Sequence, residues 1–320
     1  HESAGHLLEA FTDRDADNLV VQSCSVGLGQ VAQPTDADVI KALIDYVKEG
    51  SDVQTRHFSI ISLAQIGARD ENADPDGEFH ADLRDLLFKE IAGKGKQKSH
   101  RSWGALAGAI YTRPHPDMQP QFVDRIIAAY EDESDPSFKS SYAIALGLLN
   151  ATSAGDMIFE DFSRMKEQDF RGYAGVALGF LQYDEAAESL RGLCKNKATT
   201  PTLRLQAATG LGLMSDTQAV GTLITTLEGA ETLGVSSAVA KALGLIGDQD
   251  SIEPLKAIAV DDSAKKLTRA FACVALGIVG EKTDLPWNAA ISANNNYRAK
   301  TESIEEVLDT LASRIGAFRL

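Results

Sequence analysis

The sequence has few cysteines and few aromatic residues. Its 320 residues include three cysteines, Cys24, Cys194 and Cys273, and no C-x-x-C pair. An odd number of cysteines without that spacing argues against a disulfide framework and a zinc site. Cys24 and Cys273 lie in apolar stretches and are predicted to be buried thiols. Aromatic residues make up only 7% of the chain, so the core must consist mainly of aliphatic and small side chains.

Basic residues and long apolar runs are also scarce. The 31 Lys and Arg residues are outnumbered by 46 Asp and Glu residues, and the formal net charge of −15 argues against a nucleic-acid partner. No apolar run approaches the roughly 18 residues that membrane insertion requires. No segment has the pattern of a signal peptide. Because the chain starts at His1, we expect a processed or trimmed soluble protein that is cytoplasmic or exported after processing.

A short phrase of apolar and small residues recurs along the chain. It is clearest in the second half, as VALGFLQ, TGLGLMS, KALGLIG and VALGIVG. Its central Gly, or the Ala that replaces it, stands at Gly29, Ala64, Gly108, Gly147, Gly179, Gly212, Gly244 and Gly277. The last five positions are spaced by 32 or 33 residues, which indicates a repeat protein.

Each phrase is predicted to end the first helix of a helical hairpin. A turn with Asp or Glu follows, and then a second apolar run with a period near 3.6, as at Val220, Leu223, Ile224 and Leu227. Asp216 is the predicted N-cap of that run. Small residues also stand four positions before most of the glycines, which predicts close approach between helices of neighbouring units.

A column of basic residues stands eight positions before the Gly. Its members are Arg56, Lys139, Arg171, Arg204 and Arg269, with Arg101 one place off. We expect these side chains to reach a carboxylate or a free backbone carbonyl of the preceding unit. They would then form a ladder along the stack.

Two of the repeats resemble a known family. The segments RAFACVALGIVGE and AVAKALGLIGDQDSIEPL are similar to HEAT-like repeats of the short bacterial kind, which also occur in phycobilisome lyase subunits. The resemblance covers roughly residues 17–285. It implies an all-α fold, a right-handed α-solenoid of antiparallel helical hairpins, whose second helices line a concave face that binds another protein.

The whole chain, residues 1–320, is predicted to be a single solenoid. Residues 17–285 would hold about eight hairpins, and residues 1–16 an incomplete N-terminal unit or cap. Residues 286–320 are predicted to be an irregular segment followed by a capping helix. The apolar stripe of that helix consists of Ile304, Val307, Leu308, Leu311, Ile315 and Phe318.

An acidic insertion at residues 68–85 resembles a calcium-binding loop. Its candidate ligands are Asn72, Asp74, Asp76, Glu78 and Asp82. The first three stand at positions 1, 3 and 5, and Gly77 makes the turn at position 6. Position 12 is Leu83 instead of Glu, so the bidentate ligand is missing unless Asp82 or Asp85 supplies it. The alternative is a solvated loop that leads into the next helix.

No catalytic constellation is recognisable. The six histidines all lie within the first 115 residues, but His-Glu occurs only at His1 and Glu2, and no H-E-x-x-H pattern exists. The sequence also has no G-x-S-x-G motif, and no cysteine has a neighbouring His. Apart from calcium, no cofactor is therefore predicted.

The predicted function is non-enzymatic: a scaffold, adaptor or regulatory subunit that binds a protein or peptide on the concave face. The candidate contact residues on the second helices are Lys41, Asp45, Tyr46, Arg84, Lys89, Asp124 and Arg125, which interleave with the apolar stripe. Trp287 and Tyr297, where the repeat breaks, are further candidate anchors or pack beneath the capping helix.

The alternative function is that of an accessory subunit of an enzyme, such as a tetrapyrrole or bilin lyase-like complex. Such a role would require a deep apolar pocket with a few convergent polar groups. The sequence offers no cluster of Cys, His or Arg residues from which to build one.

Overall fold

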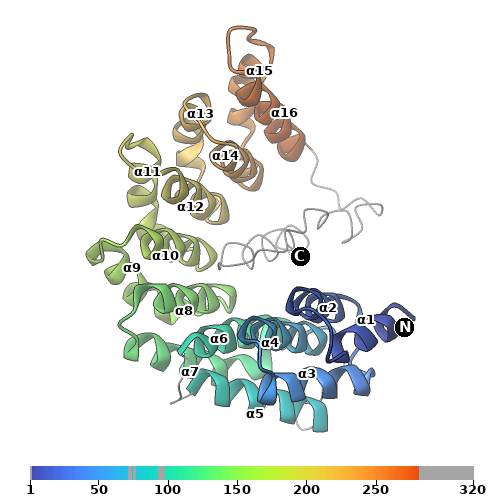
Figure 1. The fold of residues 1–320 in the computed structure, drawn as a ribbon. Helices are drawn as coiled ribbons and strands as arrows, with labels where there is room; N and C mark the ends of the chain where they lie inside the picture. The colour runs from blue at the N-terminus through green and yellow to red at the C-terminus, as the bar shows by residue number, and fades with distance from the viewer. Residues whose placement is uncertain (1, 71–73, 75–76, 93–97, 281–320) are drawn as a thin grey trace. The chain divides into compact units, whose positions relative to one another are not determined.

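The computed structural model describes residues 2–70, 74, 77–92 and 98–280. Within these ranges the protein has sixteen α-helices and five short 3-10 helices, and no strand (Figure 1). The predicted all-α fold is confirmed. Contacts divide the chain after Gly280 into two units, and every residue described here belongs to the first.

The α-helices fall into an odd-numbered and an even-numbered series. The odd-numbered helices are α1 (Glu2–Thr12), α3 (Ala37–Glu49), α5 (Glu78–Ala92), α7 (Gln119–Asp132), α9 (Gly155–Arg164), α11 (Ala187–Lys195), α13 (Val220–Glu228) and α15 (Ile252–Val260). The even-numbered helices are α2 (Asn18–Val31), α4 (Val53–Gly67), α6 (Lys98–Thr112), α8 (Pro136–Leu148), α10 (Gln168–Phe180), α12 (Pro201–Leu213), α14 (Leu233–Ile246) and α16 (Lys266–Gly280). The 3-10 helices precede α7, α9, α11, α13 and α15.

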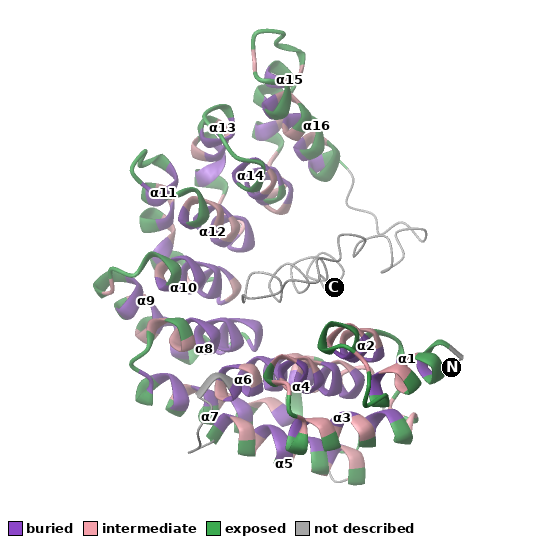
Figure 2. Cartoon of the chain, in the orientation of Figure 1, coloured by how far each residue is buried: buried purple, intermediate pink, exposed green. Residues whose placement is uncertain are grey.

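The two series form two layers. Successive even-numbered helices pack closely on one another along the described chain, whereas the odd-numbered helices contact one another less (Figure 1). We call the contact between two successive even-numbered helices a joint. Figure 2 shows the even-numbered helices from α4 to α14 as the more buried layer. The layers of a repeat stack are therefore present, as predicted.

Each hairpin, however, begins one helix later than predicted. Among helices that follow one another in the chain, the closest pairs join an odd-numbered helix to the next even-numbered helix, as in α3 with α4 and α11 with α12. The helix that ends in the Gly phrase is thus the second helix of its pair. The connection from α3 to α4 is only three residues long, and such a short connection favours antiparallel neighbours. The predicted pairing, with the Gly helix first, is wrong for this reason.

Polar side chains cap the N-termini of many helices. Asp52 accepts a hydrogen bond from the backbone N–H of Thr55 at the start of α4, and Asp135 caps α8 in the same way. Asp216 accepts from the backbone N–H of Gln218, so it caps the 3-10 helix that leads into α13 and not, as predicted, α13 itself. These caps satisfy free N–H groups and define where each helix starts.

Glycines allow the even-numbered helices to approach closely. A Cβ atom on Gly179 would lie 2.7 Å from the carbonyl oxygen of Gly210, and one on Gly212 would lie 2.7 Å from the Cα of Ala242. Because the neighbouring atoms belong to the backbone, they cannot move aside as a side chain does. The predicted packing role of the Gly column is confirmed at these joints.

The basic column ties each even-numbered helix to the helix before it. Arg56 Nε donates to the carbonyl of Val47 at 2.9 Å, at the end of α3. Three further column members reach carbonyls near the end of the preceding helix: Arg101 at Ile91, Arg204 at Asn196 and Thr199, and Arg269 at Ala259. These carbonyls have no partner within their own helix. The predicted contact with a free carbonyl is confirmed at these four positions, but it lies within each hairpin rather than between units, so these residues do not form the predicted ladder along the stack.

Candidate interaction surface

The first three candidate contact residues lie on α3. Lys41 and Asp45 are exposed and stand one turn apart. Tyr46 is half-buried, because its ring packs on Phe11 of α1 with 5.2 Å between the ring centroids. Lys41 and Asp45 are therefore available to a partner, whereas Tyr46 also contributes to the packing of α3 on α1.

The other four lie on α5 and α7, which contact each other. Lys89, Asp124 and Arg125 are exposed, and Arg84 is half-buried. The guanidinium of Arg125 lies 3.7 Å from the centroid of the Phe88 ring, a cation–π contact between the two helices.

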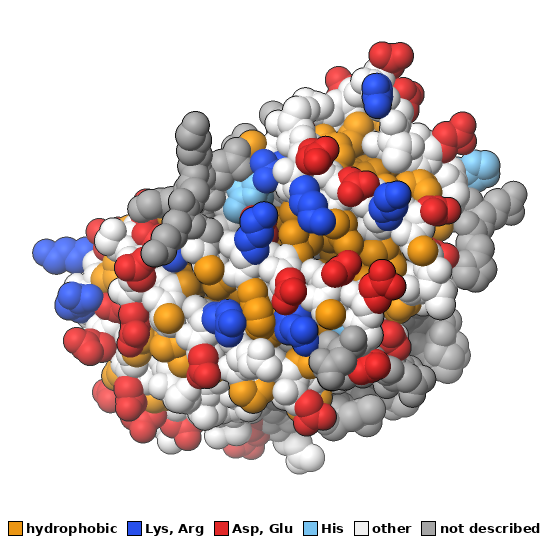
Figure 3. Space-filling view, turned by 90° about the horizontal axis from the view of Figure 1, so that it is seen from below, with side chains coloured by type: hydrophobic (Ala, Val, Ile, Leu, Met, Phe, Trp, Pro, Cys, Tyr) orange, Lys and Arg blue, Asp and Glu red, His pale blue; other side chains and the backbone are white. Residues whose placement is uncertain are grey.

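The surface has a mixed charge. Figure 3 views the molecule from the side of α3, α5 and α7, and Lys, Arg, Asp and Glu side chains alternate there around small apolar patches. Acidic side chains are the more frequent in this view, in keeping with the net charge of −15, but basic side chains stand among them. A surface of this kind selects a partner by the arrangement of its charges rather than by net charge.

These helices are the first, not the second, of their pairs. The residues predicted for the second helices therefore lie in the odd-numbered layer, because the hairpins begin one helix later than expected. The even-numbered helices α8 and α10 offer little polar surface, since residues 140–148 and 172–179 are all buried. Exposed residues are more frequent on the odd-numbered layer (Figure 2).

Several candidate residues lie outside the described residues: Trp287, Tyr297, Asn72 and Asp76. Of the other candidate calcium ligands, Asp74, Glu78 and Asp82 are exposed, and the carbonyl of Asp74 accepts a hydrogen bond from the N–H of Gly77. The described residues contain no group of three or more His, Cys, Asp or Glu side chains placed to hold a metal. Calcium binding stays a prediction, which calorimetric titration of the wild type and Asp74→Asn would test.

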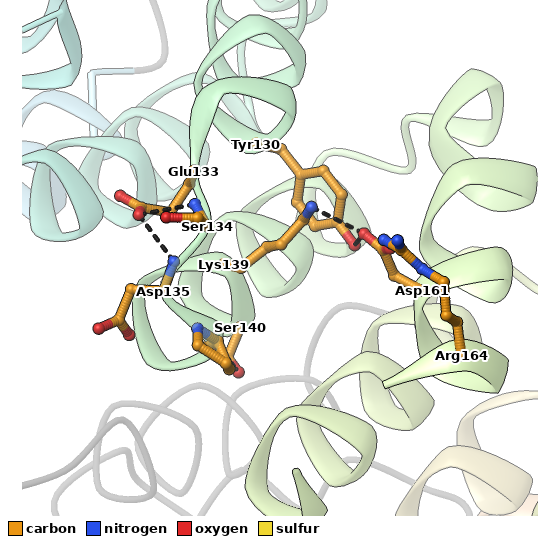
Figure 4. A network of polar contacts seen from close by, with 9 residues as sticks. Tyr130, Glu133, Ser134, Asp135, Lys139, Ser140, Asp161 and Arg164 are labelled. Carbon is orange, nitrogen blue, oxygen red and sulfur yellow. Dashed lines mark hydrogen bonds and ion pairs between the residues drawn. The ribbon is translucent and has the colours of Figure 1, made fainter. Parts of the chain in front are cut away.

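A buried charge network between α7, α8 and α9 was missed in the sequence (Figure 4). Asp161 accepts a hydrogen bond from the hydroxyl of Tyr130 at 3.0 Å and pairs with Lys139 Nζ at 2.8 Å and with Arg164. Burial raises the pKa of Asp161, but the hydrogen bonds from Lys139, Arg164 and Tyr130 outweigh it and lower the pKa overall. Lys139 belongs to the basic column, so the column spacing was the signal that could have led to this network.

A second missed cluster holds the start of the acidic insertion. His80 on α5 lies 3.0 Å from the carboxylate of Asp70 through Nε2 and 2.8 Å from the hydroxyl of Tyr111 through Nδ1. Burial raises the pKa of Tyr111 to about 12. The cluster connects Asp70, near the start of the insertion, to α5 and α6. No sequence motif announces it, because its members come from three separate segments.

The cysteines divide into two environments. Cys24 and Cys194 are buried, and burial raises the pKa of the Cys194 thiol to about 12. Cys273 on α16 is exposed, so its predicted burial is wrong. The reason is its position: no even-numbered helix follows α16 within the described residues, and the face that would pack on it is open.

Stacked helix pairs place the chain in the class of α-helical repeat proteins. Residues 196–277, which include α12 to α15 and most of α16, match the family model of HEAT repeats. Pairs of the same design continue on the N-terminal side of this match, which supports the predicted resemblance to HEAT-like repeat proteins.

Other comparisons add little. No curated protein matches the chain. The structure of human deoxyhypusine hydroxylase in complex with glycerol is similar over 87% of this chain and 96% of that chain, with 16% identical residues and a TM-score of 0.37. A likeness at this TM-score carries no argument. Among the described helices, none is long and apolar enough to cross a membrane.

Proposed function

We propose that the protein is a non-enzymatic scaffold, adaptor or regulatory subunit that binds another protein or a peptide. The observation that carries this proposal is the repeat stack itself, which contains HEAT repeats and presents similar helices side by side. A stack of this kind offers an extended surface to a macromolecular partner.

The partner contacts the face of α3, α5 and α7. Support comes from the exposed Lys41, Asp45, Lys89, Asp124 and Arg125 side chains, which lie between half-buried aromatic rings. Alternating charges beside aromatic groups give a surface both specificity and contact area. The predicted concave-face contact is replaced in this proposal by contact with the odd-numbered layer, since that layer carries the candidate residues.

A double charge swap tests this surface. Lys41→Glu with Asp45→Lys preserves the net charge and the helical character of α3 while it reverses the local charge pattern. We expect affinity capture with this variant to lose proteins that the wild type recovers. Binding of a recovered partner should weaken by roughly tenfold, as is typical of rearranged interface charges.

The matched control lies at the other end of the described chain. Glu253 and Lys256 on α15 are exposed and form an ion pair, so Glu253→Lys with Lys256→Glu makes the same kind of swap. This control should recover the wild-type partners. If both variants recover the same proteins with the same affinity, the assignment of the α3, α5 and α7 face is wrong.

A further inference from the structure

Two buried imidazoles face each other at the joint between α4 and α6. His57 on α4 and His100 on α6 are 5% and 4% exposed, and their rings meet edge to face with 4.8 Å between the centroids. His57 also stacks on Trp103 of α6, with 5.1 Å between the ring centroids and 13° between the planes. The two histidines and Trp103 thus form a cluster of rings between these helices.

Both imidazoles have a buried nitrogen without a hydrogen-bond partner. The atoms are Nε2 of His57 and Nε2 of His100. The other nitrogen of His100, Nδ1, lies 3.3 Å from the carboxylate of Glu90 on α5, so Glu90 compensates for a positive charge on His100. No carboxylate lies in contact with the ring of His57 within the described residues.

The charged groups around His57 oppose its protonation. Arg56 is adjacent on α4, and His100 lies at the start of α6. Asp52 at the start of α4 is the nearest favourable charge, but its carboxylate already accepts hydrogen bonds from Gln22 of α2 and from Thr55.

Burial is the largest cause of a lowered pKa at His57. The charges of His100 and Arg56 add to it, and together they lower the pKa from 6.5 to about 3, while Asp52 acts weakly in the opposite direction. In an open joint, the imidazole would be hydrated and would regain its ordinary pKa of 6.5.

We propose that the α4–α6 joint is a pH-sensitive hinge, which is closed while His57 is neutral and opens when His57 is protonated. The geometry behind this assignment is the buried imidazole of His57, whose Nε2 has no hydrogen-bond partner. This ring contacts the imidazole of His100 and the indole of Trp103 on the neighbouring helix. An opened joint changes the angle between the repeats on either side of it, and so changes the surface that α3, α5 and α7 present.

The sign and size of the effect follow from linkage. His57 is neutral in the closed joint. Its burial therefore stabilises the closed joint relative to the open one fully above pH 6.5, and this stabilisation is lost as the pH falls from 6.5 towards 3. At pH 5, the two pKa values predict an open population about 30-fold larger than at alkaline pH. The effect saturates below about pH 3, where both states are protonated.

Hydrogen exchange on the wild-type protein tests the hinge. After correction for intrinsic exchange rates, we expect amides of α4 and α6 to exchange on the order of 10-fold to 30-fold faster at pH 5 than at pH 7.5. Amides of α12 and α14 serve as the internal reference, because no histidine follows His115 in the sequence. Their corrected exchange should change much less.

Two variants assign the effect to His57. His57→Phe retains a flat ring against Trp103 but cannot be protonated, and Nε2 makes no hydrogen bond that would be lost. We expect it to remove most of the acid-induced increase at α4 and α6. His6→Gln is the control, since it removes an exposed imidazole on α1 and should preserve the wild-type response.

Either of two results would overturn the hinge. One is equal acceleration of exchange at α4, α6, α12 and α14 in the wild type, which would indicate global unfolding. The other is an undiminished acid response in folded His57→Phe. If that variant does not fold, the wild-type comparison between the two joints decides alone.

Discussion

The joints in the two halves of the stack are built from different contacts. Between α2 and α4, Ser25 and Ser59 share a hydrogen bond at 3.1 Å, and Ser62 donates to the carbonyl of Ser25 at 2.8 Å. Between α10 and α12, glycines bring backbone against backbone. Close packing also occurs between α2 and α4, where a Cβ on Gly29 would lie 2.8 Å from the Cα of Ser62. The first half is therefore distinguished by the hydrogen bonds and ring contacts that it adds to this packing.

The repeat is regular only in the second half because the helix lengths are constant there. The odd-numbered helices α11, α13 and α15 each have nine residues, and the phrases are 32 or 33 residues apart. In the first half α3, α5 and α7 have 13, 15 and 14 residues. The phrases at Gly29, Ala64, Gly108 and Gly147 are accordingly 35, 44 and 39 residues apart.

The largest expected effect is at a Gly joint. Gly210→Ala places a Cβ 2.6 Å from the carbonyl oxygen of Gly175, and we expect the free energy of unfolding to fall by about 2 kcal/mol. Gly192→Ala on α11 is the control, because no atom lies within 4 Å of its added Cβ. It should stabilise the helix by about 0.5–1 kcal/mol. Urea unfolding that shows the same sign for both variants would contradict the packing explanation.

A somewhat smaller effect is expected in the basic column, which both halves share. Arg204→Met removes the hydrogen bonds to the carbonyls of Asn196 and Thr199 and should cost about 1.5 kcal/mol. Arg56→Met removes the hydrogen bond to the carbonyl of Val47 and should lower the free energy of unfolding by a similar amount. Lys195→Met changes the charge equally at an exposed site and should change the unfolding midpoint little. A large difference between the two arginine variants would show that this contact is not common to both halves.

The smallest effect concerns the serine joint. Ser62→Ala removes one buried hydrogen bond to the carbonyl of Ser25 and should lower the free energy of unfolding by about 1 kcal/mol. Ser163→Ala, at an exposed position of α9, should be neutral within about 0.5 kcal/mol. If Ser62→Ala is as neutral as this control, hydrogen bonding does not stabilise the α2–α4 joint.

The repeat, its caps and its basic column were accessible from the sequence. The sequence did not reveal which two consecutive helices form a hairpin. Both connections around a helix such as α12 are short and carry capping residues, so only the packing decides which neighbour pairs with that helix. The candidate contacts Lys41, Asp45, Lys89 and Arg125 were recognised as outward-facing from their helical period. They were assigned to the wrong layer because the helices were paired incorrectly.

The sequence by itself determined that this chain folds into stacked helices, because helical periodicity, Asp caps and small residues at fixed positions are local features that recur in every unit. Only the tertiary structure decided that His57 faces His100, that Asp70 and Tyr111 enclose His80, and that Cys273 is exposed. Each of these depends on which segment, distant in the sequence, lies next to a given helix face. Local patterns predict that such a face exists, but they do not identify its neighbour.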